Sequence, residues 1–230
     1  MRLFLAGQKL FGATALELCL KRGHEIAGVS APLFASDGKQ PDRLRAAAMD
    51  RGLPILQAGT LNADTLPAGV DLIIAAHSHD FIGRKTRLKA KLGAIGYHPS
   101  LLPVHRGRDA VRWTIKMRDR VTGGSVYWLS DNMDAGDIAA QEHVFISPKD
   151  DAESLWREKL FPLGVKLLAK ALADLERGVI VAIPQDESLA TYEPSLDRPP
   201  VFRPDLPQLG APPIGFTVVK AQPVDLLRTA

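Results

Sequence analysis

Two short stretches of this chain carry side chains that can hold and move protons. Residues 93–107 (G-A-I-G-Y-H-P-S-L-L-P-V-H-R-G) place His98 at the end of an apolar run and directly before a proline-anchored loop. Residues 130–137 (S-D-N-M-D-A-G-D) are rich in carboxylates and include Asp134. An imidazole beside a carboxylate is suited to general acid–base catalysis. We expect the two stretches to face each other and to hold the reacting groups.

Other chemistries for these side chains remain open. The aspartates at 131, 134 and 137 are also compatible with a solvated turn or with Ca²⁺, but no glutamate follows at the position that an EF-hand loop requires. A metal site built from His77, His79 and His98 is conceivable, yet neither a second type of ligand such as cysteine nor an H-E-x-x-H pattern accompanies these histidines. We therefore expect no metal.

The elements that must position these residues alternate between strand and helix. Apolar runs predict strands at residues 2–7, 25–30, 53–56, 71–76, 94–98, 123–129 and 138–146, with helices reaching residue 22 and spanning 41–51, 108–118 and 151–178, the last kinked or split by Pro162. This order predicts an α/β fold: a doubly wound, mostly parallel, Rossmann-like sheet whose last two strands form an antiparallel edge. The carboxyl ends of its parallel strands meet at one sheet edge, where such proteins bind ligands.

The turn after the first strand, G-Q-K-L-F-G, argues against a nucleotide-binding domain. It matches neither G-x-G-x-x-G nor a Walker A loop. A nucleotide-binding Rossmann domain is therefore a disfavoured alternative.

Amino-acid composition and net charge narrow the class of protein further. The 230 residues are 46% hydrophobic and 24% charged with a net charge of +3, so nothing demands a nucleic-acid partner. No apolar run is long enough to cross a membrane, and the N-terminus does not resemble a signal peptide. Basic clusters at 84–91 and 106–120 are either solvated helix faces or a groove for an anion. Cys19, the single cysteine, is expected to be packed in the core, and its isolation favours a reducing, cytoplasmic location.

The composition changes near the C-terminus. Nine of the 17 prolines lie between residue 184 and the end of the chain. We therefore expect one catalytic domain at residues 1–183 and an extended tail at 184–230 that wraps over it without forming a second folded domain.

The pattern Y-H-P-S-L-L-P-x-x-R-G, followed by T-G-G-S and M-D-A-G-D-I-A-A-Q, resembles the folate-dependent formyltransferase superfamily. The likeness begins at F-L-A-G-Q-K-L-F-G and continues to A-T-Y-E near residue 191. Within that superfamily it is greatest to the N-terminal hydrolase domain of 10-formyltetrahydrofolate dehydrogenase. The resemblance implies the formyltransferase fold, and an enzyme that passes the formyl group of 10-formyltetrahydrofolate to water or a small amine through a tetrahedral intermediate.

The family's catalytic trio is Asn, His and Asp. His98 and Asp134 match it, but Gly96 stands at the asparagine position. The resemblance implies that His98 stabilises the oxyanion and assists proton transfer while Asp134 orients it. The glycine has no amide to donate to the oxyanion, and we expect an ordered water in the space that it leaves. The dehydrogenase's hydrolase domain also lacks this asparagine, so the glycine does not imply a dead enzyme.

The resemblance also implies a folate cleft. The pterin is expected against the main chain of the loops at 76–83 and 130–134, and the wall beside the formyl group is expected at 100–103. Arg106 either braces its loop or contributes to the site. The residues that we assign to substrate binding are Ala76, His77, Phe81, Ile82, Ser100, Leu101, Leu102, Pro103, Arg106, Ser130, Asp131 and Met133.

Two domains found in relatives have no counterpart in this sequence. The C-terminal β-barrel domain of methionyl-tRNA formyltransferases is absent, so tRNA is not the expected acceptor. The aldehyde dehydrogenase domain is also absent, so NADP-linked oxidation is not expected within this chain. A non-catalytic folate-binding module is the alternative that the missing asparagine motivates. The acceptor and the oligomeric state are left open.

Overall fold

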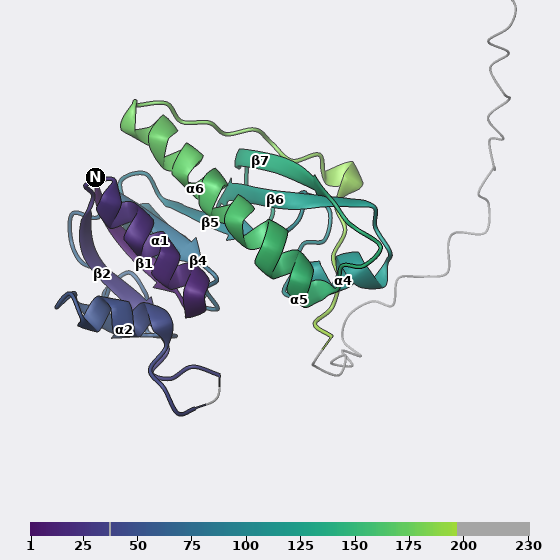
Figure 1. The fold of residues 1–230 in the computed structure, drawn as a ribbon. Helices are drawn as coiled ribbons and strands as arrows, with labels where there is room; N and C mark the ends of the chain where they lie inside the picture. The colour runs from purple at the N-terminus through teal and green to yellow at the C-terminus, as the bar shows by residue number, and fades with distance from the viewer. Residues whose placement is uncertain (37, 197–230) are drawn as a thin grey trace, which may run out of the picture. The chain divides into compact units, whose positions relative to one another are not determined.

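A seven-stranded sheet forms the centre of the structure, a computed structural model that describes residues 1–36 and 38–196 (Figure 1). The strands are β1 (Arg2–Gly7), β2 (Glu25–Ala31), β3 (Ile55–Gln57), β4 (Leu72–Ala76), β5 (Ala94–His98), β6 (Val121–Trp128) and β7 (Ile138–Phe145). Their spatial order is β3-β2-β1-β4-β5-β6-β7. The first five strands run parallel, and β6 and β7 are antiparallel to their neighbours. The predicted fold class is confirmed.

Helices pack against the sheet. They are α1 (Lys9–Lys21), α2 (Arg43–Met49), α3 (Arg84–Lys89), α4 (Ala110–Lys116), α5 (Ala152–Ser154) and α6 (Phe161–Glu176). Helices α1 and α6 lie across the same face of the sheet (Figure 1), where Leu16 and Leu168 belong to one continuous apolar core. Cys19 is part of that core and fully buried, as predicted. The opposite face is covered by a smaller cluster that includes Phe4 and Ile73.

The predicted long helix changes type before Pro162. After α5 comes a π-helical segment, Leu155–Leu160, and α6 begins at Phe161. Proline lacks an N–H, and its ring would clash with the carbonyl four residues earlier in a regular α-helix. The wider π-helical turn accommodates this conflict.

The third strand begins two residues later than predicted and ends one residue later, at Ile55–Gln57 instead of 53–56. Pro54 has no N–H for a ladder, although its carbonyl accepts a hydrogen bond from the Val29 N–H. The regular pairing with β2 therefore begins at Ile55.

The T-G-G-S motif lets two side chains approach strand β6 closely. A Cβ atom on Gly123 would lie 2.5 Å from a methyl of Leu101, and one on Gly124 would lie 2.5 Å from the Tyr97 hydroxyl. The Tyr97 hydroxyl passes on to donate to the carbonyl of Leu160 at 2.6 Å. The glycines thus allow the loop after β5 and the helical layer to pack directly on β6.

The first part of the predicted tail, residues 184–196, packs against the loops at the sheet edge. A short 3₁₀ turn forms at Glu187–Leu189, and Tyr192 pairs with Arg106 in an isolated parallel bridge. The remainder of the predicted tail, from residue 197, lies outside the described residues. The domain boundary at residue 183 stays a prediction.

Within residues 1–36 and 38–196, no helix combines the length and the apolar character needed to cross a bilayer.

Candidate active site

His98 ends strand β5 and is held by the loop that follows it. Its side chain is buried, and its Nε2 lies 2.7 Å from the carbonyl oxygen of His105. A carbonyl only accepts hydrogen bonds, so Nε2 carries the hydrogen in this arrangement. The other ring nitrogen, Nδ1, faces Asp134 Oδ2 at 3.7 Å. The anchored Nε2 leaves Nδ1 as the nitrogen that can exchange a proton.

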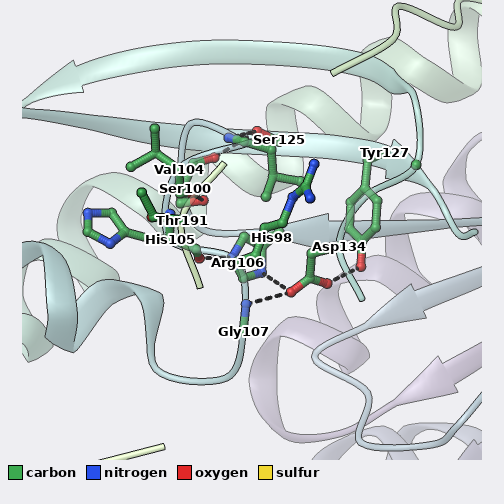
Figure 2. Close-up of polar contacts among 12 residues, drawn as sticks. His98, Ser100, Val104, His105, Arg106, Gly107, Ser125, Tyr127, Asp134 and Thr191 are labelled. Atoms are coloured by element: carbon green, nitrogen blue, oxygen red, sulfur yellow. Dashed lines mark hydrogen bonds and ion pairs between the residues drawn. The ribbon is translucent and has the colours of Figure 1, made fainter. Parts of the chain in front are cut away.

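Asp134 is held from both of its carboxylate oxygens (Figure 2). Oδ2 accepts the main-chain N–H of Gly107 at 2.8 Å, and Oδ1 accepts the Tyr127 hydroxyl at 2.6 Å. The backbone of Asp134 is left-handed, with φ of 51°. The 3.7 Å between Asp134 Oδ2 and His98 Nδ1 exceeds hydrogen-bond length. The two groups therefore act on each other through charge and can share a small reacting group.

Tyr127 occupies the surroundings of Gly96, where we had expected an open space. The two residues are cross-strand neighbours in β6 and β5. A Cβ on Gly96 would lie 3.4 Å from the Tyr127 ring, 3.5 Å from Ala75 and 3.0 Å from a methyl of Leu129. The expectation of a water-sized space is therefore wrong at the Cβ position, because side chains from β6 and its end fill it.

The Tyr127 hydroxyl is a permanent donor. Burial raises its pKa well above the usual value, and the negative charge of Asp134 raises it further. Nothing in the sequence pattern singled out Tyr127. Its role depends on the β5–β6 register, which only the folded sheet defines.

The predicted wall at 100–103 is folded by serine hydroxyls. Ser100 is fully buried and donates to the Val104 carbonyl at 2.6 Å. Ser125, opposite His98 on β6, donates to the Ser100 carbonyl and accepts the Leu102 N–H. Leu102 is buried as a result, whereas Leu101 and Pro103 remain half-buried. Ser100 thus shapes the wall, and its own hydroxyl is engaged within the loop.

The two loops expected to hold the pterin are joined by Arg87. Its guanidinium donates to the carbonyl of Ile82 and to the carboxylate of Asp131. Phe81 and Met133 are 86% and 65% exposed on these loops, so both are free to cover a ligand. Ser130 donates to the Asn132 carbonyl and stiffens its turn. Arg87 was missed from the sequence because it lay in a run of basic residues typical of a solvated helix.

His77 follows the buried end of β4 at Ala76. It has a left-handed backbone, with φ of 59°, and its ring packs against Trp156. Burial lowers the pKa of His77 to about 4, and the positive charge of Lys9 adds to this effect. The imidazole is therefore neutral at pH 7.

Arg106 is turned toward the C-terminal segment. Its guanidinium is fully buried and donates to Gln185, Glu187 and the Tyr192 hydroxyl. The hydrogen bond to Glu187 is the main reason that the pKa of Arg106 is raised. These contacts match the bracing alternative for Arg106.

A hollow of about 170 Å³ opens at the carboxyl ends of the parallel strands. It is lined by Gly7, Gln8, Pro32, Ala58, Ser78, His79 and Asp80. It lies where the strand order reverses between β1 and β4, the usual place for a ligand in an open α/β sheet. In the part of the chain that the structure describes, no three His, Cys, Asp or Glu side chains gather as metal ligands would.

Comparisons with known proteins agree with one another. Residues 56–172 match the family described as formyl transferase. The mitochondrial 10-formyltetrahydrofolate dehydrogenase of Mus musculus is 36% identical over 203 residues, which cover 84% of this chain but 22% of that enzyme. The methionyl-tRNA formyltransferase of Chloroflexus aurantiacus is 34% identical over 208 residues, covering 86% of this chain and 66% of the relative. This chain thus spans about a fifth of the length of the dehydrogenase.

A solved structure supports the fold. The N-formyltransferase of Helicobacter canadensis, in complex with folinic acid and dTDP-3-aminofucose, superposes with a TM-score of 0.69 at 18% identity. The match covers 83% of this chain and 70% of that one.

Proposed function

Because this chain belongs to the formyl transferase family, we propose that it is an enzyme that acts on 10-formyltetrahydrofolate and passes the formyl group to water or to a small amine. The observation that carries the proposal is the pair of His98, which is buried at the carboxyl end of β5, and Asp134, which is largely buried beside it. Similarity to the 10-formyltetrahydrofolate dehydrogenases favours the formyl folate as donor. Folinic acid in the Helicobacter enzyme is consistent with a folate in this fold.

The proposed reaction starts from neutral His98, with its hydrogen on Nε2 and the lone pair of Nδ1 toward Asp134. Water or an amine attacks the formyl carbon and gives a proton to Nδ1, while the carbonyl electrons move to the formyl oxygen. The imidazolium that forms is stabilised by the charge of Asp134. Nδ1–H then returns the proton to N10 as the C–N10 bond breaks, which releases tetrahydrofolate and either formate or a formamide.

In the proposed complex, the pterin lies against the loops at 76–83 and 130–134. The exposed side chains of Phe81 and Met133 cover it, and Arg87 keeps the loops together. The half-buried Leu101 and Pro103 face the formyl group. An amine acceptor would enter from the hollow beside Gln8 and Ser78. We propose the cytoplasm as the location, because the only cysteine is buried and unpaired in the core.

The direct test is to incubate the purified protein with 10-formyltetrahydrofolate and follow the release of tetrahydrofolate, with and without a panel of small amines. We expect turnover that is lost in His98→Ala. Binding of folinic acid without turnover under any acceptor would instead support a non-catalytic folate-binding module.

A further inference from the structure

The segment of residues 184–196, here called the closing segment, contacts both loops that hold the catalytic pair. The Thr191 N–H donates to the Pro103 carbonyl, the Arg106 N–H donates to the Thr191 carbonyl, and the Glu193 N–H donates to the Arg106 carbonyl. Further along, the Trp113 indole donates to the carbonyl of Pro194. The loop after His98 is therefore paired with a segment about ninety residues later in the chain.

Gln185 links this segment to the Asp134 loop. Its Oε1 accepts from the Arg106 guanidinium at 2.7 and 3.2 Å. Its Nε2 donates to the carbonyls of Asp134 at 2.8 Å and Gly136 at 2.7 Å. An arginine can only donate and a carbonyl can only accept, so the amide makes these four hydrogen bonds in one orientation alone.

The linked loops are the two that carry the reacting groups. Arg106 belongs to the loop whose His105 carbonyl accepts the His98 Nε2–H, and Gly107 donates to Asp134 Oδ2. Gln185 thus adds a second tie between these loops, on the main chain of Asp134 instead of on its carboxylate. Because Asp134 has a left-handed backbone, its side-chain direction depends on how this turn is held.

The other end of the closing segment holds His105. The Nδ1 of that imidazole lies 3.0 Å from Glu193 Oε1, and its Nε2 lies 2.7 Å from Asp119 Oδ2. The His105 N–H donates to the Thr191 hydroxyl at 2.8 Å. Glu193 of the closing segment and Asp119 thus hold the residue whose carbonyl orients His98. The closing segment therefore reaches His98 through His105 and bonds the main chain of Asp134 directly through Gln185.

We propose that Gln185 is a positioning residue that sets the place of Asp134 relative to His98. The expected effects on rate rest on the proposed function, whereas the expected effect on the position of Asp134 does not. A misplacement of about 1 Å at such a pair can cost about 10²-fold in rate.

The test uses Gln185→Glu in the full chain. This isosteric change keeps acceptors for Arg106 but replaces the two donated N–H bonds with an oxygen facing the carbonyls of Asp134 and Gly136. We expect kcat for tetrahydrofolate release to fall by about 10²-fold, with KM changed by less than about threefold. Gln185→Met, which removes both sets of hydrogen bonds, should lower kcat at least as much. The matched control is Glu187→Gln, which weakens the ion pair between Glu187 and Arg106. It should leave kcat within about threefold of the wild-type value.

Equal losses in Gln185→Glu and Glu187→Gln, or a rise in KM at constant kcat, would overturn the positioning role. A crystal structure of Gln185→Glu supplies a readout that does not depend on turnover. Displacement of the 130–136 loop away from His98 supports the proposal, even if the wild-type protein turns over no formyl folate. An unmoved Asp134 carboxylate refutes it.

Discussion

Asp134→Asn separates the charge of the carboxylate from its shape. The asparagine side chain has nearly the same size, and its amide oxygen can still accept a hydrogen bond from Gly107 or Tyr127. What disappears is the negative charge that faces His98 Nδ1. In the proposed reaction that charge matters most when His98 carries the proton of the nucleophile.

The distance gives the size of the effect. Two unit charges 3.7 Å apart interact by about 4.5 kcal/mol at an effective dielectric constant of about 20. Both side chains are largely buried, so screening by solvent is limited. Loss of the whole term would lower the rate by about 10³-fold, and the dipole of the new amide recovers part of it. We therefore expect kcat to fall by about 10²- to 10³-fold.

The assay is steady-state release of tetrahydrofolate from 10-formyltetrahydrofolate, with folinic acid binding measured separately by calorimetry. Affinity should change by less than about threefold, because the pterin loops keep their own contacts through Arg87. The control is Asp137→Asn, which removes a carboxylate from the same loop. The main chain at Asp137 stays anchored, because its carbonyl accepts the Trp128 N–H. A loss of kcat below about tenfold, or a loss confined to binding, would refute the charge argument.

Three further predictions follow from the surroundings of the pair. Tyr127→Phe removes one donor from Asp134 while Gly107 still holds the carboxylate, so kcat should fall by about tenfold with little change in melting temperature; an unchanged kcat would show that the hydroxyl is dispensable. Gly96→Ala should cost about 1–3 kcal/mol in urea unfolding because its Cβ would crowd Leu129, and Leu129→Ala in the same chain should recover part of this; equal stability would contradict the packing. The pKa of His77 is about 4 when folded and near 6.5 when unfolded, so the unfolded state binds more protons between these values and stability should fall by up to about 3 kcal/mol from pH 6.5 to 4, with a shallower slope in His77→Gln.

The sequence pattern was enough to predict that His98 lies at the carboxyl edge of the sheet, but it does not place Asp134, which follows the antiparallel strand β6. Apolar runs marked the strands, and their alternation with helices required a parallel sheet whose carboxyl ends meet. These arguments need only local periodicity and the order of strands and helices along the chain. The Ser100 carbonyl accepts a hydrogen bond from the hydroxyl of Ser125 on a neighbouring strand. No local sequence pattern predicts this contact.

What could not be predicted depends on register and on contacts between distant parts of the chain. Tyr127 lies opposite Gly96 only because β6 pairs with β5 in one register, and a shift of one residue would turn its side chain to the other face. Gln185 reaches Asp134 from a proline-rich stretch whose composition predicts little regular structure. Side-chain hydrogen bonds between such segments leave no periodic trace in the sequence.

Gly96 and Tyr127 are best understood together. The ring of Tyr127 lies within van der Waals distance of the place that a Cβ atom at position 96 would occupy, and the methyl of Leu129 lies closer still, at 3.0 Å. In return, the tyrosine supplies a neutral, permanently protonated donor to Asp134. In the proposed reaction a side-chain amide at position 96 would act on the formyl oxygen, whereas the Tyr127 hydroxyl donates to the carboxylate of Asp134. Tyr127 therefore contributes to the proposed reaction by holding Asp134, and through it the pair that activates the nucleophile.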